Sequence, residues 1–178
     1  MSKAVMLSIR PKWVEKIARG EKTIEVRKTR PKLDTPFKCY IYCTIDHPYI
    51  SVSCGELDKL NYRTNTVGRC NGKVIGEFTC DRIYELAPLN HAPDDVEKQA
   101  CLTREEIVNY LNGTGYGWHI SDLKIYDAPK DLSEFRRACP NSWYCESCAM
   151  YWENNGTCGN ESLQIRRPPQ SWCYVEEG

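Results

Sequence analysis

The stretch that most constrains the fold is residues 5–27, whose pattern predicts a strand, a helix, a tight turn and a second strand. Val5, Leu7 and Ile9 alternate with Met6 and Ser8, which is the period of a buried strand. Pro11 suits the first turn of a helix, where its missing N–H has no partner to lose. Gly20 can adopt the left-handed conformation that ends a helix. These local signals place a short helix between two strands.

Three charged side chains follow Gly20 in this stretch. Glu25 and Arg27 are two residues apart in the strand predicted over 23–27, so their side chains rise from the same face. Lys22 can join them only if it lies in the turn, before the alternation of the strand begins. A desolvated lysine has a lowered pKa and can act as a base, while an arginine offers a planar donor fork for phosphate or carboxylate. The alternative is an ion-paired strand edge that binds no ligand.

The residues at 20–27, Gly-Glu-Lys-Thr-Ile-Glu-Val-Arg, match the G-x-K-x-x-E-x-R motif of the ASCH family, which has a PUA-like fold. Residues 72–78 and 117–123 also resemble segments of that family. The resemblance therefore covers roughly residues 5–135 and the last strand. In the family this motif lines a cleft proposed to bind RNA or a nucleoside. The resemblance thus implies a module that binds RNA or a nucleotide in such a cleft.

The same resemblance leaves open a small amidohydrolase. Some small ASCH proteins deacetylate N4-acetylcytidine with the motif lysine, a threonine of the strand and a glutamate elsewhere. Lys22 occupies the lysine position, but Glu25 stands where those enzymes have the threonine. If the chain is an enzyme, we expect Lys22, Thr23 and Glu25 to be its catalytic residues, with Lys22 activating Thr23 or water. The further glutamate could be Glu97, Glu105 or Glu106.

The charge distribution predicts one basic face rather than a basic protein. The 178 residues carry no net charge, yet residues 1–38 hold eleven Lys and Arg against four Asp and Glu. The loop over 28–32 adds cations directly after the motif. The predicted ligand-binding or RNA-binding residues are Lys22, Glu25, Arg27, Lys28, Arg30, Trp118 and His119. A solvated basic face without a ligand is the alternative.

Trp118 and His119 belong to a strand predicted over 116–126. An aromatic ring stacked on a base contributes about 1–3 kcal/mol, and a histidine can hydrogen-bond a ligand. The alternatives are a core tryptophan and a structural histidine.

The pattern of elements predicts an α+β domain that is mostly β. Further strands are expected over 37–45, 73–86 and 171–175. Helices are expected over 94–101 and 103–111, the second with a capping-box pattern of Thr103 and Glu106 at its start. A long polar excursion over 46–72 includes a possible short hairpin near 50–53. Gly76 within a strand indicates either that another backbone approaches closely or that the strand bends. The PUA-like fold implied by the resemblance is a small β-barrel flanked by about three helices.

We expect residues 1–138 to form the ASCH or PUA-like domain, 139–160 a Cys-rich insertion, and 161–178 the final strand of the domain. No apolar run approaches the ~20 residues that a membrane span needs. The N-terminus shows no apolar signal region. These features predict a cytoplasmic protein with no membrane partner. They leave the oligomeric state open.

Four of the eleven cysteines, Cys139, Cys145, Cys148 and Cys158, fall close together. The C-x2-C pair lets one turn present two sulfurs to a tetrahedral metal, and the flanking cysteines can close the site. The sequence therefore predicts a structural zinc knuckle with no open position for catalysis. Such a knuckle could contact RNA, or it could make the chain a protein-binding adaptor, which is a third function class. The alternative is a loop of reduced cysteines.

Overall fold

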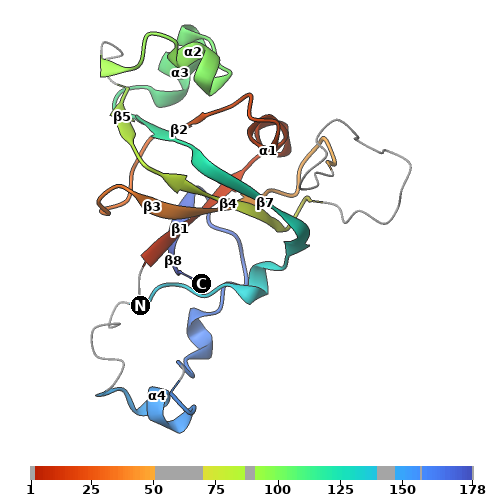
Figure 1. Cartoon of the computed structure of the whole chain (residues 1–178), viewed down its shortest axis with the longest axis vertical. Helices are drawn as coiled ribbons and strands as arrows, with labels where there is room; N and C mark the ends of the chain where they lie inside the picture. The colour runs from red at the N-terminus through yellow and green to blue at the C-terminus, as the bar shows by residue number, and fades with distance from the viewer. Residues whose placement is uncertain (1–2, 51–69, 87–90, 140–146, 157, 178) are drawn as a thin grey trace.

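The computed structural model describes residues 3–50, 70–86, 91–139, 147–156 and 158–177 (Figure 1). Within them the strands are β1 (Lys3–Ile9), β2 (Ile24–Arg27), β3 (Phe37–Cys43), β4 (Val74–Cys80), β5 (Ile83–Glu85), β6 (Tyr116–His119), β7 (Ser121–Lys130) and β8 (Trp172–Glu176). The helices are α1 (Pro11–Ala18), α2 (Val96–Ala100), α3 (Arg104–Leu111) and α4 (Ala149–Glu153), with 3-10 turns η2 (Leu132–Glu134) and η4 (Glu161–Leu163). The fold is mixed α+β and mostly strand, as predicted.

The larger sheet has the strand order β7-β4-β3-β1-β8. β1 pairs in parallel with β3 and antiparallel with β8. Its alternate residues enter two different cores, with Val5 and Leu7 in one and Ala4 and Met6 in the other. A strand that is buried on both faces needs apolar residues at nearly every position. This explains the almost unbroken apolar run at the start of the chain.

The smaller sheet has the order β2-β6-β5 and carries the motif strand. Ile24 and Val26 of β2 pack in a third core together with Val96 of α2 and Ile107 of α3. Figure 1 shows α2 and α3 together at the end of the molecule nearest β5 and β2. The apolar face of β2 is thereby covered by helices. Its polar residues, Glu25 and Arg27, point to the other side, as the alternation predicts.

Closure into a barrel is not confirmed, because the described strands form two open sheets. The predicted strand over 73–86 is divided between β4 and β5, and the one over 116–126 between β6 and β7. In each case the two parts join different sheets, so the chain changes sheets at Asp81–Arg82 and at Ile120. Gly76 does mark a close approach: a Cβ there would lie 2.4 Å from the backbone oxygen of Lys124.

The three predicted helices are present as α1, α2 and α3, and α1 is followed by Gly20 at φ +71°. α3 begins with the predicted capping box, in which Thr103 and Glu106 each accept a hydrogen bond from the other's backbone N–H. α4, within the Cys-rich segment, was not predicted. None of the described helices is both long and apolar enough to cross a membrane.

The prediction of zinc is wrong for the part of the chain that the structure describes. No three His, Cys, Asp or Glu side chains among these residues are grouped closely enough to hold a metal ion. Cys139, Cys148 and Cys158 are free cysteines without a disulfide bond, and Cys145 lies outside the described residues. The spacing that suggested a knuckle is also compatible with cysteines on separate turns. The possible hairpin near 50–53 likewise falls mostly outside the described residues, at 51–69.

Candidate functional site

A cavity of about 690 Å³ opens where α1, β2 and α3 meet the segments after β3 and before β8. Its size is within the range of about 300–1,000 Å³ that is typical of small-molecule sites. The residues that line it are Ser8, Arg10, Trp13, Lys22, Glu25, Val26, Arg27, Thr44, Ile45, Asp46, Leu102, Glu106, Tyr110 and Gln170. All three charged residues of the motif are among them.

The turn after α1 places Lys22 at the cavity. Gly20 reverses the chain, and the backbone N–H of Lys22 donates to the carbonyl of Lys16 at 3.1 Å. Lys22 therefore lies in the turn before β2 begins at Ile24. This is the condition under which its side chain can meet those of Glu25 and Arg27.

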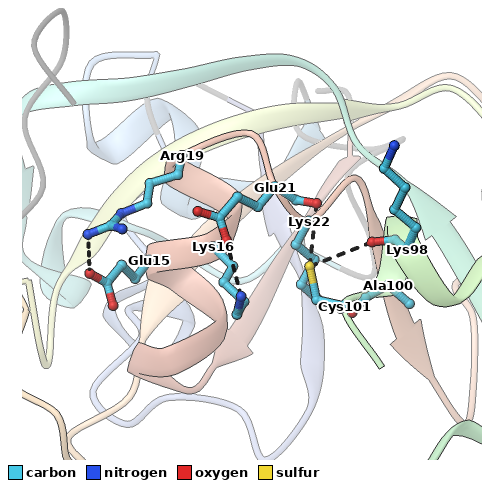
Figure 2. Close-up of polar contacts among 8 residues, drawn as sticks. All are labelled: Glu15, Lys16, Arg19, Glu21, Lys22, Lys98, Ala100 and Cys101. Carbon is cyan, nitrogen blue, oxygen red and sulfur yellow. Dashed lines mark hydrogen bonds and ion pairs between the residues drawn. The ribbon is translucent and has the colours of Figure 1, made fainter. Parts of the chain in front are cut away.

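The end of α2 holds the same turn in place. The carbonyl of Gln99 accepts from the N–H of Thr23 at 2.9 Å, and that of Ala100 accepts from Nζ of Lys22 at 2.7 Å. Figure 2 shows the next residue, Cys101, with its Sγ against the carbonyl of Glu21. The last carbonyls of a helix have no partner within it and carry partial negative charge, so they are suited to a lysine.

Glu25 lies between the two cations and pairs with both. Its Oε1 is 3.0 Å from Nη2 of Arg27, and its Oε2 is 3.5 Å from Nζ of Lys22. The three residues are only 2–6% exposed. Buried charges are tolerated when they are paired and hydrogen-bonded, as these are. The cluster is thus a fixed arrangement of donors and acceptors on the wall of the cavity.

Burial lowers the pKa of Lys22, and the charge of Glu25 opposes that shift. The ammonium also lies 5.2 Å from the ring centre of Trp13, in a cation–π contact. Lys22 is consequently easier to deprotonate than an exposed lysine, although its neighbours still favour the charged form.

Arg27 ties together three parts of the chain. Its Nη2 donates to the carbonyl of Ser8 at 2.8 Å, and its Nη1 donates to Oγ of Ser171 at 3.3 Å. Its Nε is buried and has no hydrogen-bond partner among the described residues. The guanidinium is therefore largely used to hold Glu25 against β1 and the start of β8.

Two other lining residues have side chains available to a ligand. Arg10, just before α1, is exposed, and its guanidinium makes no hydrogen bond or ion pair with any described residue. Tyr110 of α3 is 45% exposed. Nζ of Lys28 lies 5.4 Å from the Tyr110 ring centre, which places this predicted cation beside the cavity. Arg30 lies over Tyr116 instead, with Cζ 5.8 Å from the ring centre.

Besides Lys28 and Arg30, three further predicted site residues do not line the cavity. Trp118 is completely buried in the core, where it packs edge-on against Phe37, because its face of β6 turns toward the larger sheet. His119 pairs with Asp81, with Nδ1 2.6 Å from Oδ1. The hydroxyl of Thr23 contacts Oε1 of Gln99 at 3.3 Å.

The charges around the cavity are balanced. Arg10, Lys22 and Arg27 line it together with the acids Glu25, Asp46 and Glu106. The pKa of Glu106 is lowered by the hydrogen bond from the backbone of Thr103, so this carboxylate is charged at neutral pH. The cavity wall therefore offers both hydrogen-bond donors and acceptors and has no excess of either charge.

The sequence interpretation missed Arg10, Trp13, Tyr110 and Gln170 as cavity residues. One available signal is the spacing in α3. Residues four apart share a face, so Tyr110 accompanies Glu106, beside the apolar stripe of Ile107 and Leu111. Arg10 and Gln170 give no such local signal, because they reach the cavity only through tertiary packing.

Comparison with known proteins supports the resemblance to the ASCH family that the motif indicated. Residues 7–44 match the model of the ASCH domain family. A search of curated proteins finds no match.

Crystal structures of two single-residue variants of ZmASCH from Zymomonas mobilis are similar to the chain. The first is 16% identical, with 99% of this chain and 92% of that chain covered and a TM-score of 0.51. The second is 15% identical, with 98% and 89% covered and the same TM-score of 0.51. At this identity the likeness concerns the fold. The ASCH resemblance of the motif is thus confirmed by the family match over residues 7–44 and by a fold shared with ASCH proteins.

Proposed function

We propose that the chain binds RNA or a nucleotide, with one nucleotide in the cavity. The observation that carries this proposal is the buried cluster of Lys22, Glu25 and Arg27 on the wall of an open cavity of about 690 Å³. Buried charges are costly, and this cluster is held from three sides by backbone carbonyls and Ser171. The ASCH match over the motif supports the same function.

In this proposal each group has a distinct role. Glu25 accepts hydrogen bonds from a base edge or a ribose hydroxyl, and Lys22 donates to the same nucleotide. Arg27 keeps Glu25 in position. Exposed cations contact phosphate, and the nearest are Arg10 and Lys28, with Arg30 farther along the loop.

Tyr110 provides the stacking surface. Its ring lines the cavity, is partly exposed and lies under a cation. Stacking of one base on an aromatic ring contributes about 1–3 kcal/mol, whatever the base. Tyr110 takes the role that the sequence suggested for Trp118, which is buried.

The test measures the affinity for single-stranded RNA of about 12 nucleotides, a length in the usual range of single-strand sites. The variants are Arg10→Ala and Tyr110→Ala, whose side chains are exposed, so the core is not disturbed. Their controls are Arg82→Ala, which removes an exposed arginine outside the cavity lining, and Val108→Ala on the same helix as Tyr110. We expect roughly tenfold weaker binding for Tyr110→Ala. Equal affinities for all four variants would contradict the proposal.

A second candidate function is hydrolysis of an acetylated nucleoside such as N4-acetylcytidine. It is favoured by the lowered pKa of Lys22, which desolvation causes at the cavity wall. A neutral Lys22 would take a proton from water, and the hydroxide would add to the acetyl carbon. The C–N bond would then break, acetate would leave, and the cytosine amine would receive the proton. Water is the nucleophile here, since the Thr23 hydroxyl contacts Gln99 instead.

Release of acetate from N4-acetylcytidine separates the two functions. Turnover that is lost in Lys22→Met, with the variant still folded by circular dichroism, would support the hydrolase. No release by the wild type at high enzyme concentration would remove this candidate and leave the binding function.

A further inference from the structure

A second hollow, of about 590 Å³, is surrounded by arginines near the C-terminal end of the chain. We call it the arginine hollow. It is lined by Arg137, Glu161, Ser162, Gln164, Arg166 and Arg167, all exposed. The three cations face a single acid, so the hollow has an excess of positive charge, unlike the balanced cavity.

The three arginines are unpaired within the part of the chain that the structure describes. None of their guanidinium groups makes an ion pair or a hydrogen bond with any described residue, in contrast to the adjacent Arg136. Arg136 lies 3.8 Å from a carboxylate oxygen of Glu176 and donates to the carbonyl of Asn160 at 2.7 Å. Neighbouring like charges repel one another, and a bound anion would relieve this repulsion.

The hollow is built on a fixed backbone. The N–H of Arg137 donates to the carbonyl of Leu163 at 2.7 Å, and the N–H of Ile165 donates to that of Phe135 at 3.1 Å. Leu163 and Ile165 are buried, so the alternation of the extended chain turns Gln164 and Arg166 outward. The arginines therefore project from an anchored segment.

The same segment leads directly to the cavity. Pro168 and Pro169 follow Arg167, the carbonyl of Pro169 accepts from Oγ of Ser8 at 2.6 Å, and Gln170 lines the cavity. An extended proline segment rises about 3.1 Å per residue, so Arg167 is about 9 Å along the chain from Gln170. Figure 1 shows the blue end of the chain passing from α4 up into β8 beside β1. The hollow and the cavity are thus joined by a short, stiff link.

We propose that the arginine hollow binds backbone phosphates of a single-stranded RNA whose nucleotide occupies the cavity. Arginine forks bind phosphate oxygens in a bidentate manner. The balanced cavity attracts a polyanion weakly, and the hollow supplies the missing positive charge. This inference rests on the proposed function, since the strand is held in register by the nucleotide in the cavity.

The experiment compares a dinucleotide with a single-stranded RNA of about 12 nucleotides, long enough to reach beyond one site. The variant is Arg166→Ala with Arg167→Ala. Its control is Arg82→Ala with Lys124→Ala, which removes the same charge from two exposed positions outside both the cavity and the hollow. Affinities are measured over a range of salt concentrations.

For the longer RNA we expect the arginine variant to bind more weakly than the control. The slope of log affinity against log salt concentration should become shallower by about 0.7 for each phosphate that the arginines no longer neutralise. Binding of the dinucleotide should be unchanged. If the longer RNA binds variant and control alike while dinucleotide binding persists, the inference is overturned and the cavity proposal stands. If the wild type binds neither RNA, the proposed function itself is overturned.

Discussion

The cavity and the arginine hollow both contain arginine, but they use it in opposite ways. Arg27 is 6% exposed and is held by Glu25, Ser8 and Ser171. Arg166 and Arg167 are exposed and have no partner among the described residues. A buried, paired charge fixes geometry and can discriminate between ligands by shape. An exposed, unpaired charge adds long-range attraction that salt weakens.

The largest predicted difference is in stability. Arg27→Ala leaves Glu25 without its closest partner in a buried site, so we expect the free energy of unfolding to fall by about 3–5 kcal/mol. Arg166→Ala should change it by no more than about 0.5 kcal/mol, as is usual for exposed positions. Urea denaturation of both variants measures this. A mild effect of Arg27→Ala would mean that the cluster is solvated rather than buried and paired.

A second prediction separates affinity from salt dependence. Tyr110→Ala should weaken RNA binding by about 1–3 kcal/mol at every salt concentration, because stacking is not ionic. The slope of log affinity against log salt should stay as in the wild type. The Arg166→Ala and Arg167→Ala double variant should instead flatten that slope. If both variants change the slope equally, the cavity and the arginine hollow do not differ in their ionic contribution to RNA binding.

A third prediction concerns pH. Burial lowers the pKa of Lys22 in the folded state below the value of 10.5 that is usual for lysine. Between the folded and the usual pKa the unfolded chain binds more protons, so stability rises with pH through this window. Each unit of lowering corresponds to about 1.4 kcal/mol.

The measurement is the free energy of unfolding of the wild type minus that of Lys22→Met, followed up to pH 10.5. We expect this difference to increase with pH. Removing Arg166 and Arg167 should give no such trend, because guanidinium groups stay charged throughout. A flat or falling difference for Lys22→Met would show that its charge is not desolvated.

The smallest predicted effect is the difference between two neighbouring arginines, Arg136 and Arg137. Arg136→Ala removes a partly exposed ion pair and a hydrogen bond, and should cost about 1 kcal/mol of stability. Arg137→Ala should cost less, yet weaken binding of the longer RNA more. Thermal unfolding and RNA titration of the two variants together test this reversal. If Arg136→Ala has the larger effect on RNA binding as well as on stability, Arg137 does not contact the RNA.

How much could be predicted from sequence depended on how local the signal was. The alternation of one strand predicted a shared face for Glu25 and Arg27. It gave only a condition for Lys22, which must lie in the turn to join them, and the structure meets that condition. The capping box of α3 and the close approach at Gly76 were also local, and both were correct. The residues that complete the site come from distant segments: Ser171 is 144 positions from Arg27 in the chain.

The errors have a related cause. Alternation places Trp118 on one face of its strand, but it does not say that this face meets Phe37 in the core. Strand patterns over 73–86 and 116–126 do not reveal that the chain changes sheets within each. Cysteine spacing showed that a zinc site was possible, but not that the sulfurs would be brought together.

Photocrosslinking tests the central claim most directly, because it needs no variant that might unfold. Single-stranded RNA containing thiouridine is irradiated with the wild-type protein, and the crosslinked peptides are identified by mass spectrometry. If the cavity holds a nucleotide, crosslinks should occur at its lining, first at Tyr110 and Trp13, and an excess of free nucleotide should suppress them. Crosslinks confined to residues outside the lining, insensitive to free nucleotide, would contradict the account.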